Sequence, residues 1–396
     1  MTRRSLVIFV AVASCLLAAA AVVGALLLGD DKPDPPPSLR TLDLDACRDR
    51  EDEAARDCFA RRFQAVVDGR DDPRSAVQAI SELALSEGGF LLENCHVVMH
   101  TVGRTYARDA DVSLASLMDY LPQSNDPGCS AGFAHGLVTG VAPDIDPSKP
   151  GEAAAACADA GTRFQRYSCV HGIGHAFMRL YADQLEPALE LCVALGPDVA
   201  PDCAQGAYHD YWFAVKGADD TALREQPITD PRQLCGAQPD EFVRPCWYRA
   251  FLESRSPGFQ LEAPQDLEDL CEGLDGVQRA GCITGAAVIG PSDPAAQLRI
   301  CADLEAPTDA ASCVHGTKVQ NLLDASTREY VRVIEGCEDF AAEARAACYR
   351  WLGKALAVVT DGRFERSGCP QLAAADARRH CQEGARTMNE ALVTFS

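Results

Sequence analysis

The stretch DPRQLCGAQPDEFVRPCWYRA, residues 230–250, carries the pattern that decides the fold. It begins with Asp230-Pro231, and these residue types are preferred at the N-cap and the first position of a helix. Cys235 follows, and Cys246 comes after ten further residues. This spacing fits a short helix, a turn and the start of a second helix. We therefore predict a helical hairpin whose two helices are joined by a disulfide.

The same spacing recurs along the chain. Ten or eleven residues separate the members of each predicted pair: Cys47 with Cys58, Cys157 with Cys169, Cys192 with Cys203, Cys235 with Cys246, Cys271 with Cys282, Cys301 with Cys313, Cys337 with Cys348, and Cys369 with Cys381. When Cys95 and Cys129 are added, the second cysteines follow one another at steps of 31 to 43 residues. This period is typical of arrays of helical hairpins. The sequence thus contains about ten copies of one unit.

Packed helices bring facing Cα atoms to about 4–6 Å, which is the distance that a disulfide needs. Six repeats also place a glycine three residues after the second cysteine, which predicts close backbone packing there: Gly132, Gly172, Gly206, Gly285, Gly316 and Gly384. We predict an all-α fold, an α-solenoid of about ten disulfide-stapled helical hairpins. In period and stapling the chain resembles the cysteine-rich Sel1-like repeat proteins, relatives of the tetratricopeptide repeats. The resemblance covers Cys47 to Cys381 and implies a secreted array, without implying any functional residue.

The N-terminal segment predicts a membrane anchor. Residues 6–28 form an uncharged apolar run of 23 residues, long enough to cross a bilayer as a helix, and arginines precede it. We predict a cytoplasmic stub at 1–5, a transmembrane signal anchor at 6–28, a proline-rich linker at 29–40 and an extracytoplasmic helical-repeat domain at 41–396. The predicted location is the cell membrane, single-pass, with the C-terminal domain outside the cytoplasm. A cleaved signal peptide and a lipid attached to Cys15 are the alternatives.

Charge and cysteine content restrict the partners and the compartment. The net charge of −22 repels nucleic acids, so we expect no nucleic-acid partner. The 19 cysteines fit an oxidising compartment.

Cys95 and Cys129 belong to repeats that lack a first cysteine. Equivalent positions on neighbouring helices are expected about 8–10 Å apart, whereas a disulfide spans at most about 7 Å. The two residues therefore form either a distorted bond between repeats or two free thiols. The bond is the favoured alternative, because free thiols rarely persist in oxidising compartments.

Six histidines follow the repeat cysteines closely, at offsets of +1, +5, +6, +2, +6 and +6: His96, His100, His135, His171, His175 and His209. At 100° per residue these offsets lie on the side of the second helix opposite the cysteine, which predicts a ladder of imidazoles across repeats. Imidazoles of this kind bind zinc or copper. The predicted metal ligands are His96, His100, His135, His171 and His175. Structural packing and proton sensing are the alternatives.

The motifs of zinc proteases, haem attachment, phosphate loops and nucleophile elbows are absent from the sequence. We predict a binding scaffold with a histidine-lined transition-metal site. Its expected partners are the membrane, through the N-terminal helix, and a protein on the concave face. One alternative is a metal-dependent enzyme that uses Glu93 or Asp210 as its acid or base. The other is a metal-free protein-interaction solenoid.

Overall fold

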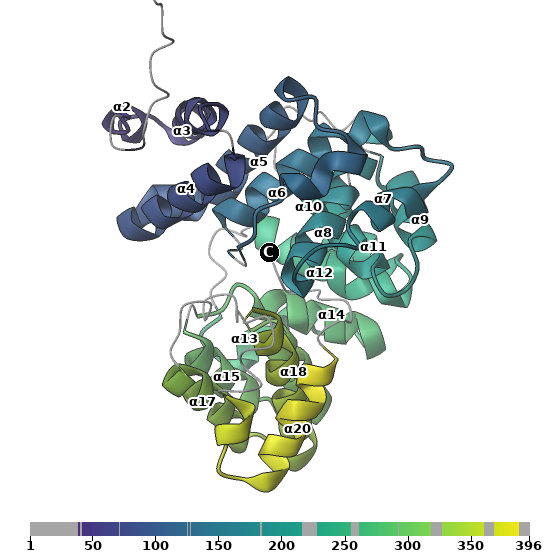
Figure 1. Ribbon diagram of the computed structural model, residues 1–396. Coiled ribbons are helices and arrows are strands. Elements are labelled where there is room, and N and C mark those ends of the chain that lie inside the picture. The colour runs from purple at the N-terminus through teal and green to yellow at the C-terminus, as the bar shows by residue number, and fades with distance from the viewer. Residues whose placement is uncertain are drawn as a thin grey trace, which may run out of the picture. The chain divides into compact units, whose positions relative to one another are not determined.

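The computed structural model describes residue 39 and residues 42–387, apart from 71, 125, 127, 183, 216–227, 255–260, 292, 318–326 and 360–367. The described residues form helices joined by turns, and no strand occurs among them (Figure 1). The all-helical prediction is thus confirmed for this part of the chain.

Each repeat pairs a short first helix with a second helix that carries the repeat cysteine. The second helices are α3 (Asp52–Asp68), α5 (Gly89–Asp109), α6 (Cys129–Gly140), α8 (Arg163–Leu180), α10 (Ala200–Val215), α12 (Asp240–Ser254), α14 (Gly276–Ala287), α16 (Pro307–His315), α18 (Ala342–Val359) and α20 (Ala375–Arg386). The first helices are α2 (Asp45–Arg48), α4 (Pro73–Glu87), η2 (Leu114–Asp119), α7 (Pro150–Ala156), α9 (Leu185–Ala194), α11 (Pro231–Gly236), α13 (Pro264–Leu270), α15 (Pro294–Ala302), α17 (Thr327–Glu335) with η5 (Gly336–Asp339), and η6 (Cys369–Gln371). The short helix η3 (Ala142–Asp144) follows α6.

Aspartate and proline start several of the first helices. Asp72, Asp230 and Asp293 each accept a hydrogen bond from the backbone N–H two residues later, and a proline occupies the next position. The carboxylate satisfies an amide that has no partner inside the helix, and proline has no N–H to satisfy. The predicted N-cap at Asp230 is confirmed, and Asp72 and Asp293 are equivalent caps.

All eight predicted cysteine pairs are disulfides, with Cα–Cα distances of 5.3 to 5.9 Å. The bonds join Cys47 to Cys58, Cys157 to Cys169, Cys192 to Cys203, Cys235 to Cys246, Cys271 to Cys282, Cys301 to Cys313, Cys337 to Cys348, and Cys369 to Cys381. Each bond links the first helix, or the residue that directly follows it, to the second helix of the same repeat. In the chain-entropy model, loops of this size contribute about 2–3 kcal/mol each to stability.

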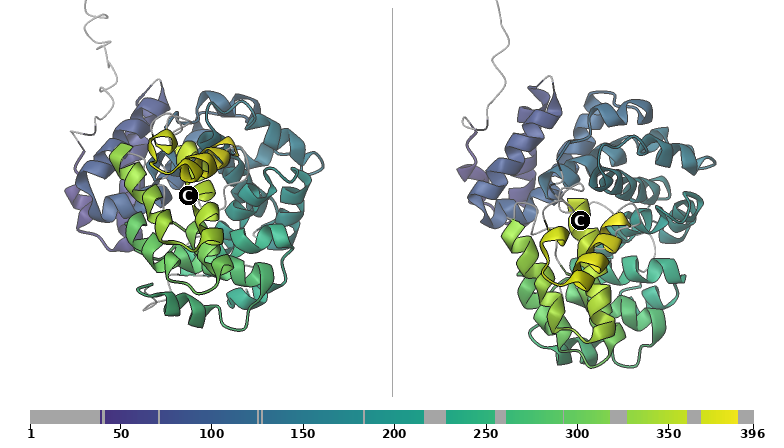
Figure 2. Two further views of the ribbon diagram at one scale, coloured as in Figure 1. Left: turned by 90° about the horizontal axis from the view of Figure 1, so that it is seen from below. Right: turned by 60° about the horizontal axis from the view of Figure 1, so that its bottom comes forward.

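The second helices pack against one another in chain order, from α3 to α20 (Figure 1). Both views of Figure 2 show the same succession, because the colours change step by step from one helix to the next. The recurrent glycine lies at these contacts. A Cβ atom at Gly132 would overlap the carbonyl oxygen of His96, and one at Gly206 would overlap that of His171. The close backbone packing therefore joins second helices of consecutive repeats, and not the two helices of one hairpin.

Cys95 and Cys129 form the ninth disulfide and link α5 to α6. Their Cα atoms are 4.9 Å apart, much closer than the 8–10 Å expected from ordinary helix packing. That expectation was wrong because glycines line this interface. Gly103 and Gly136 touch backbone atoms of the opposite helix, as Gly132 does. Neither cysteine is therefore available as a thiolate ligand.

The predicted location at the cell membrane requires correction. No helix in the described part of the chain is both long and apolar enough to span a bilayer, and this finding contradicts the single-pass location. The predicted anchor, residues 6–28, lies outside the described residues, as do the stub at 1–5 and nearly all of the linker at 29–40.

The glycine contacts make a testable prediction. Gly132→Ala or Gly206→Ala should lower the free energy of unfolding by at least about 2 kcal/mol, because the added methyl group overlaps a backbone carbonyl. Urea unfolding monitored by circular dichroism measures this change. Gly151→Ala is the matched control, because no atom lies within 4 Å of a Cβ at that position in α7. Equal stability of the control and the two variants would contradict the packing argument.

Candidate metal centre

Six histidines meet on four consecutive second helices. We call His96, His100, His135, His171, His175 and His209 the histidine cluster; they lie on α5, α6, α8 and α10. Neighbouring rings in the cluster have centroids 4.4 to 5.9 Å apart. The predicted ladder is thus a compact group in which each imidazole contacts several others.

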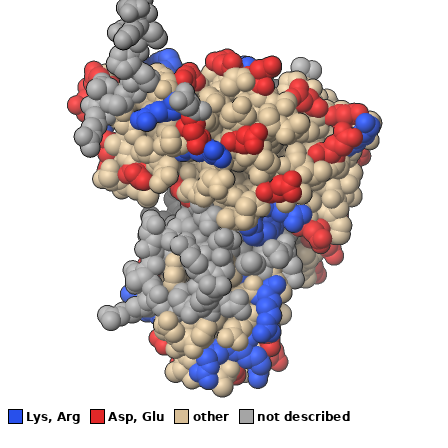
Figure 3. All heavy atoms as spheres, in the orientation of Figure 1, with Lys and Arg blue, Asp and Glu red and all other residues tan. Residues whose placement is uncertain are grey.

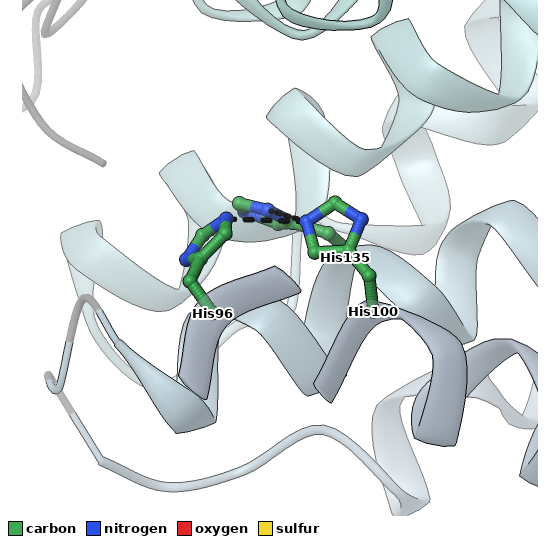
Figure 4. Close-up of side chains that lie close together, drawn as sticks. All are labelled: His96, His100 and His135. Carbon is green, nitrogen blue, oxygen red and sulfur yellow. Dashed lines mark hydrogen bonds between the residues drawn. The ribbon is translucent and has the colours of Figure 1, made fainter. Parts of the chain in front are cut away.

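Three nitrogens of the cluster converge (Figure 4). His96 and His100 are one turn apart on α5, and their Nε2 atoms are 3.1 Å apart. His100 Nε2 also lies 3.2 Å from Nδ1 of His135, which projects from α6. The close contact between these two helices, fixed by the glycines and by the disulfide between Cys95 and Cys129, brings His135 within this distance.

Hydrogen bonds among these three nitrogens do not pair all of them. An imidazole nitrogen carries either one hydrogen or one lone pair, directed in the plane of the ring. His100 Nε2 therefore makes one well-directed hydrogen bond, although two ring nitrogens lie at bonding distance. In a tetrahedral site with metal–nitrogen bonds of 2.0–2.1 Å, neighbouring ligand nitrogens are about 3.3 Å apart. The observed separations match that spacing.

His135, His171 and His175 form a second possible metal-binding group, which shares His135 with the first. Here His171 already has partners for both nitrogens. Its Nδ1 lies 3.1 Å from Gln205 Oε1, and Arg249 donates to its Nε2 at 3.3 Å. The first group therefore suits a cation better than the second.

His175 is oriented by a carboxylate. Its Nδ1 donates to Asp210 Oδ1 at 2.8 Å, which leaves Nε2 as the nitrogen available for a ligand. That Nε2 atom is buried and has no hydrogen-bond partner. Histidines that bind metals commonly donate their second ring N–H to a carboxylate in this way.

The second helix that follows α10, which is α12, contributes a charged pair. Arg249 and Glu253 on α12 are buried and 3.2 Å apart, and Glu253 Oε1 lies 3.4 Å from His209 Nε2. Neither Arg249 nor Glu253 was among the site residues predicted from the sequence. The i,i+4 spacing of arginine and glutamate in the repeat after His209 is the signal that would have indicated their pairing.

Four members of the cluster are neutral at physiological pH. Burial lowers the pKa of His100, His135, His171 and His209 well below the ordinary value of 6.5. Neighbouring histidines and Arg249 lower these pKa values further. Each nitrogen lone pair therefore stays available without competition from a proton at pH 7.

A cavity of about 220 Å³ reaches the cluster from outside. It is lined by His100 and His209 of the cluster, by Asp210, and by arginines of α5 and α8, Arg104 and Arg179. A small molecule in this cavity would thus meet the rings of His100 and His209 and the side chain of Asp210.

The structure brings together all five predicted ligands, His96, His100, His135, His171 and His175. It also adds His209, whose +6 offset is the same as that of His135 and His175. Of the two predicted acid or base residues, Asp210 lies in the site and Glu93 is exposed elsewhere on α5.

The buried neutral histidines predict that acid destabilises the metal-free protein. On unfolding, these histidines regain a pKa near 6.5 and take up protons, so their effect is absent above pH 6.5 and grows as the pH falls below it. Each contributes up to about 1.4 kcal/mol per pH unit. Urea unfolding between pH 8 and pH 5.5 measures the slope. Stability that stays constant or rises towards pH 5.5 would contradict the burial of neutral rings.

Comparison with known proteins gives no direct assignment. No family model, no curated protein and no solved structure matches the chain. The resemblance to Sel1-like repeat proteins therefore stays an expectation, and the functional argument depends on the geometry of the histidine cluster.

Proposed function

We propose that the chain is a helical-repeat scaffold that binds one transition-metal ion, zinc or copper, through His96, His100 and His135. The observation that carries this proposal is the convergence of three ring nitrogens on one point, with His100 Nε2 at 3.1 and 3.2 Å from the other two. His100 Nε2 forms a well-directed hydrogen bond with only one of the other two nitrogens. A cation between them, by contrast, binds all three nitrogens.

The remaining coordination is supplied by His175 or by a molecule from solvent. The His175 ring centroid is 4.9 Å from that of His100, and Asp210 holds its Nδ1 so that Nε2 is available. Three protein ligands leave a position open, and four close the site. Neutral imidazole is a preferred ligand of both zinc and copper, and the disulfides within and between repeats fit an oxidising, extracytoplasmic compartment.

The succession of second helices supports an α-solenoid as the architecture of this scaffold. A protein partner on its concave face stays a prediction.

Elemental analysis of the full chain, purified oxidised and without a histidine tag, tests the proposal. We expect close to one zinc or copper ion per chain, and at least a hundredfold loss of affinity in His100→Ala, because this residue contacts both other ligands. His380→Ala is the matched control, since His380 lies on α20 outside the cluster. Circular dichroism verifies that each variant is folded. A metal-free protein, or equal metal content in both variants, would refute the site.

One observation favours a second candidate function, a metal-dependent enzyme. Asp210 lines the cavity beside His100, and its Oδ2 atom has no hydrogen-bond partner although Oδ1 accepts from His175. In this hypothesis Asp210 Oδ2 accepts a proton from a molecule bound at an open metal position. A positioned general base contributes about 10²–10⁴-fold to a rate.

Asp210→Asn tests the enzyme hypothesis, because the amide oxygen still accepts the hydrogen bond from His175. In a screen of metal-loaded protein against hydrolytic and oxidative substrates, the variant should keep its metal and lose at least a hundredfold in turnover. An active variant would remove Asp210 from the mechanism, and an inactive wild-type protein would leave the binding scaffold as the function.

A further inference from the structure

A second hollow lies among the C-terminal repeats. This cavity has a volume of about 600 Å³, within the range of small-molecule sites. Side chains of α12, α14, α16 and α18 line it: Arg244, Val277, His315, Arg350, Trp351 and Lys354. His315 and Arg350 follow their repeat cysteines by two residues, as His171 does, and Lys354 follows by six, as His175 does. The cavity therefore uses the same face of the second helices as the histidine cluster.

The cavity is basic, although the chain is strongly acidic. Figure 3 shows acidic side chains in separate groups over the visible face of the molecule. The cavity, by contrast, is lined by three basic side chains of α12 and α18, namely Arg244, Arg350 and Lys354, of which Arg350 is exposed. The acidic residues at the cavity, Asp240 and Glu241, are exposed at the start of α12.

Arg244 shows the imbalance most directly. Its Nε atom is buried and has no hydrogen-bond partner. Burial lowers the pKa of this guanidinium, and no carboxylate in the described part of the chain counteracts the effect. Arg244 itself is partly buried, so its guanidinium at the wall of the cavity offers a positive charge and hydrogen-bond donors to an anionic ligand.

Two aromatic groups add hydrogen-bonding capacity. Trp351 is 8% exposed, and its indole Nε1 has no hydrogen-bond partner. The ring of His315 lies beside it, with centroids 4.7 Å apart. Burial, together with Arg244 and Lys354, lowers the pKa of His315 to about 3, so the imidazole is neutral at pH 7 and still able to donate one hydrogen bond.

We propose that this cavity binds a small organic anion that carries phosphate or carboxylate groups. Arg244 and Lys354 supply the charge, the Trp351 indole N–H donates a hydrogen bond, and the ring of Trp351 with Val277 forms the apolar wall. This site is separate from the histidine cluster and does not depend on a metal there.

Isothermal titration calorimetry on the full chain tests the proposal. The probes are glucose 6-phosphate for the phosphate class, citrate for the carboxylate class, and glucose as the uncharged control. We expect one site for at least one anionic probe and none for glucose. The probe that binds more tightly shows whether the ligand carries phosphate or carboxylate groups. Binding in this cavity should also quench tryptophan fluorescence, and this quenching should be absent in Trp351→Phe.

Variants distinguish specific binding in this cavity from non-specific electrostatic attraction of the anion to basic side chains. Arg244→Gln and Lys354→Gln should each weaken binding at least tenfold, and Trp351→Phe several-fold. Arg299→Gln is the matched control, because Arg299 is an exposed arginine on α15. Binding should change less than twofold in this control. Absence of binding to both anions, or equal losses in Arg299→Gln and Lys354→Gln, would overturn the proposal. Lys354→Gln keeps the test valid if circular dichroism shows that Arg244→Gln does not fold.

Discussion

The backbone contact between consecutive second helices is the constraint on which the rest of the structure depends. Glycine three residues after the repeat cysteine lets a carbonyl of the preceding second helix approach the helix backbone directly in five repeats, whereas Gly172 faces the side chain of Val138. At this separation, side chains at offsets of +1, +2, +5 and +6 meet those of the neighbouring repeats. A Cβ atom at Gly132 or Gly206 would push the helices apart and, with them, the imidazoles. The recurrent glycine thus sets both the packing of the repeats and the density of the histidine cluster.

Much of this arrangement follows from sequence spacing. The cysteine pairs indicated the hairpins and eight disulfides, and the offsets of His96, His100, His135, His171 and His175 placed them on one face. The distance between neighbouring second helices was less predictable from the sequence. The average distance between packed helices predicted a distorted bond between Cys95 and Cys129. The glycines bring α5 and α6 closer than this average, and that effect follows only from which backbone atoms they contact in the folded chain. The pairing of Asp210 with His175, and that of Arg249 with Glu253, likewise depend on which helices are neighbours.

Burial of the histidine cluster and metal binding by it both favour the neutral form of the imidazole rings. Removing an imidazole from water favours its neutral form, which packs without a counter-charge and also offers a lone pair. Packing alone, however, explains neither the three nitrogens around one point nor the buried Nε2 atom of His175, which has no partner. A protein that used histidine merely as a semi-polar core residue would direct these atoms to hydrogen-bond acceptors.

The disulfide between Cys95 and Cys129 has a consequence for how such an array is able to evolve. The other eight bonds each close within one repeat, so a gene that gains or loses such a unit gains or loses complete bonds. Loss of either α5 or α6 would instead leave an unpaired thiol and separate His96 and His100 from His135. Gain or loss of the two repeats that carry the converging imidazoles therefore preserves complete bonds only when both are gained or lost together.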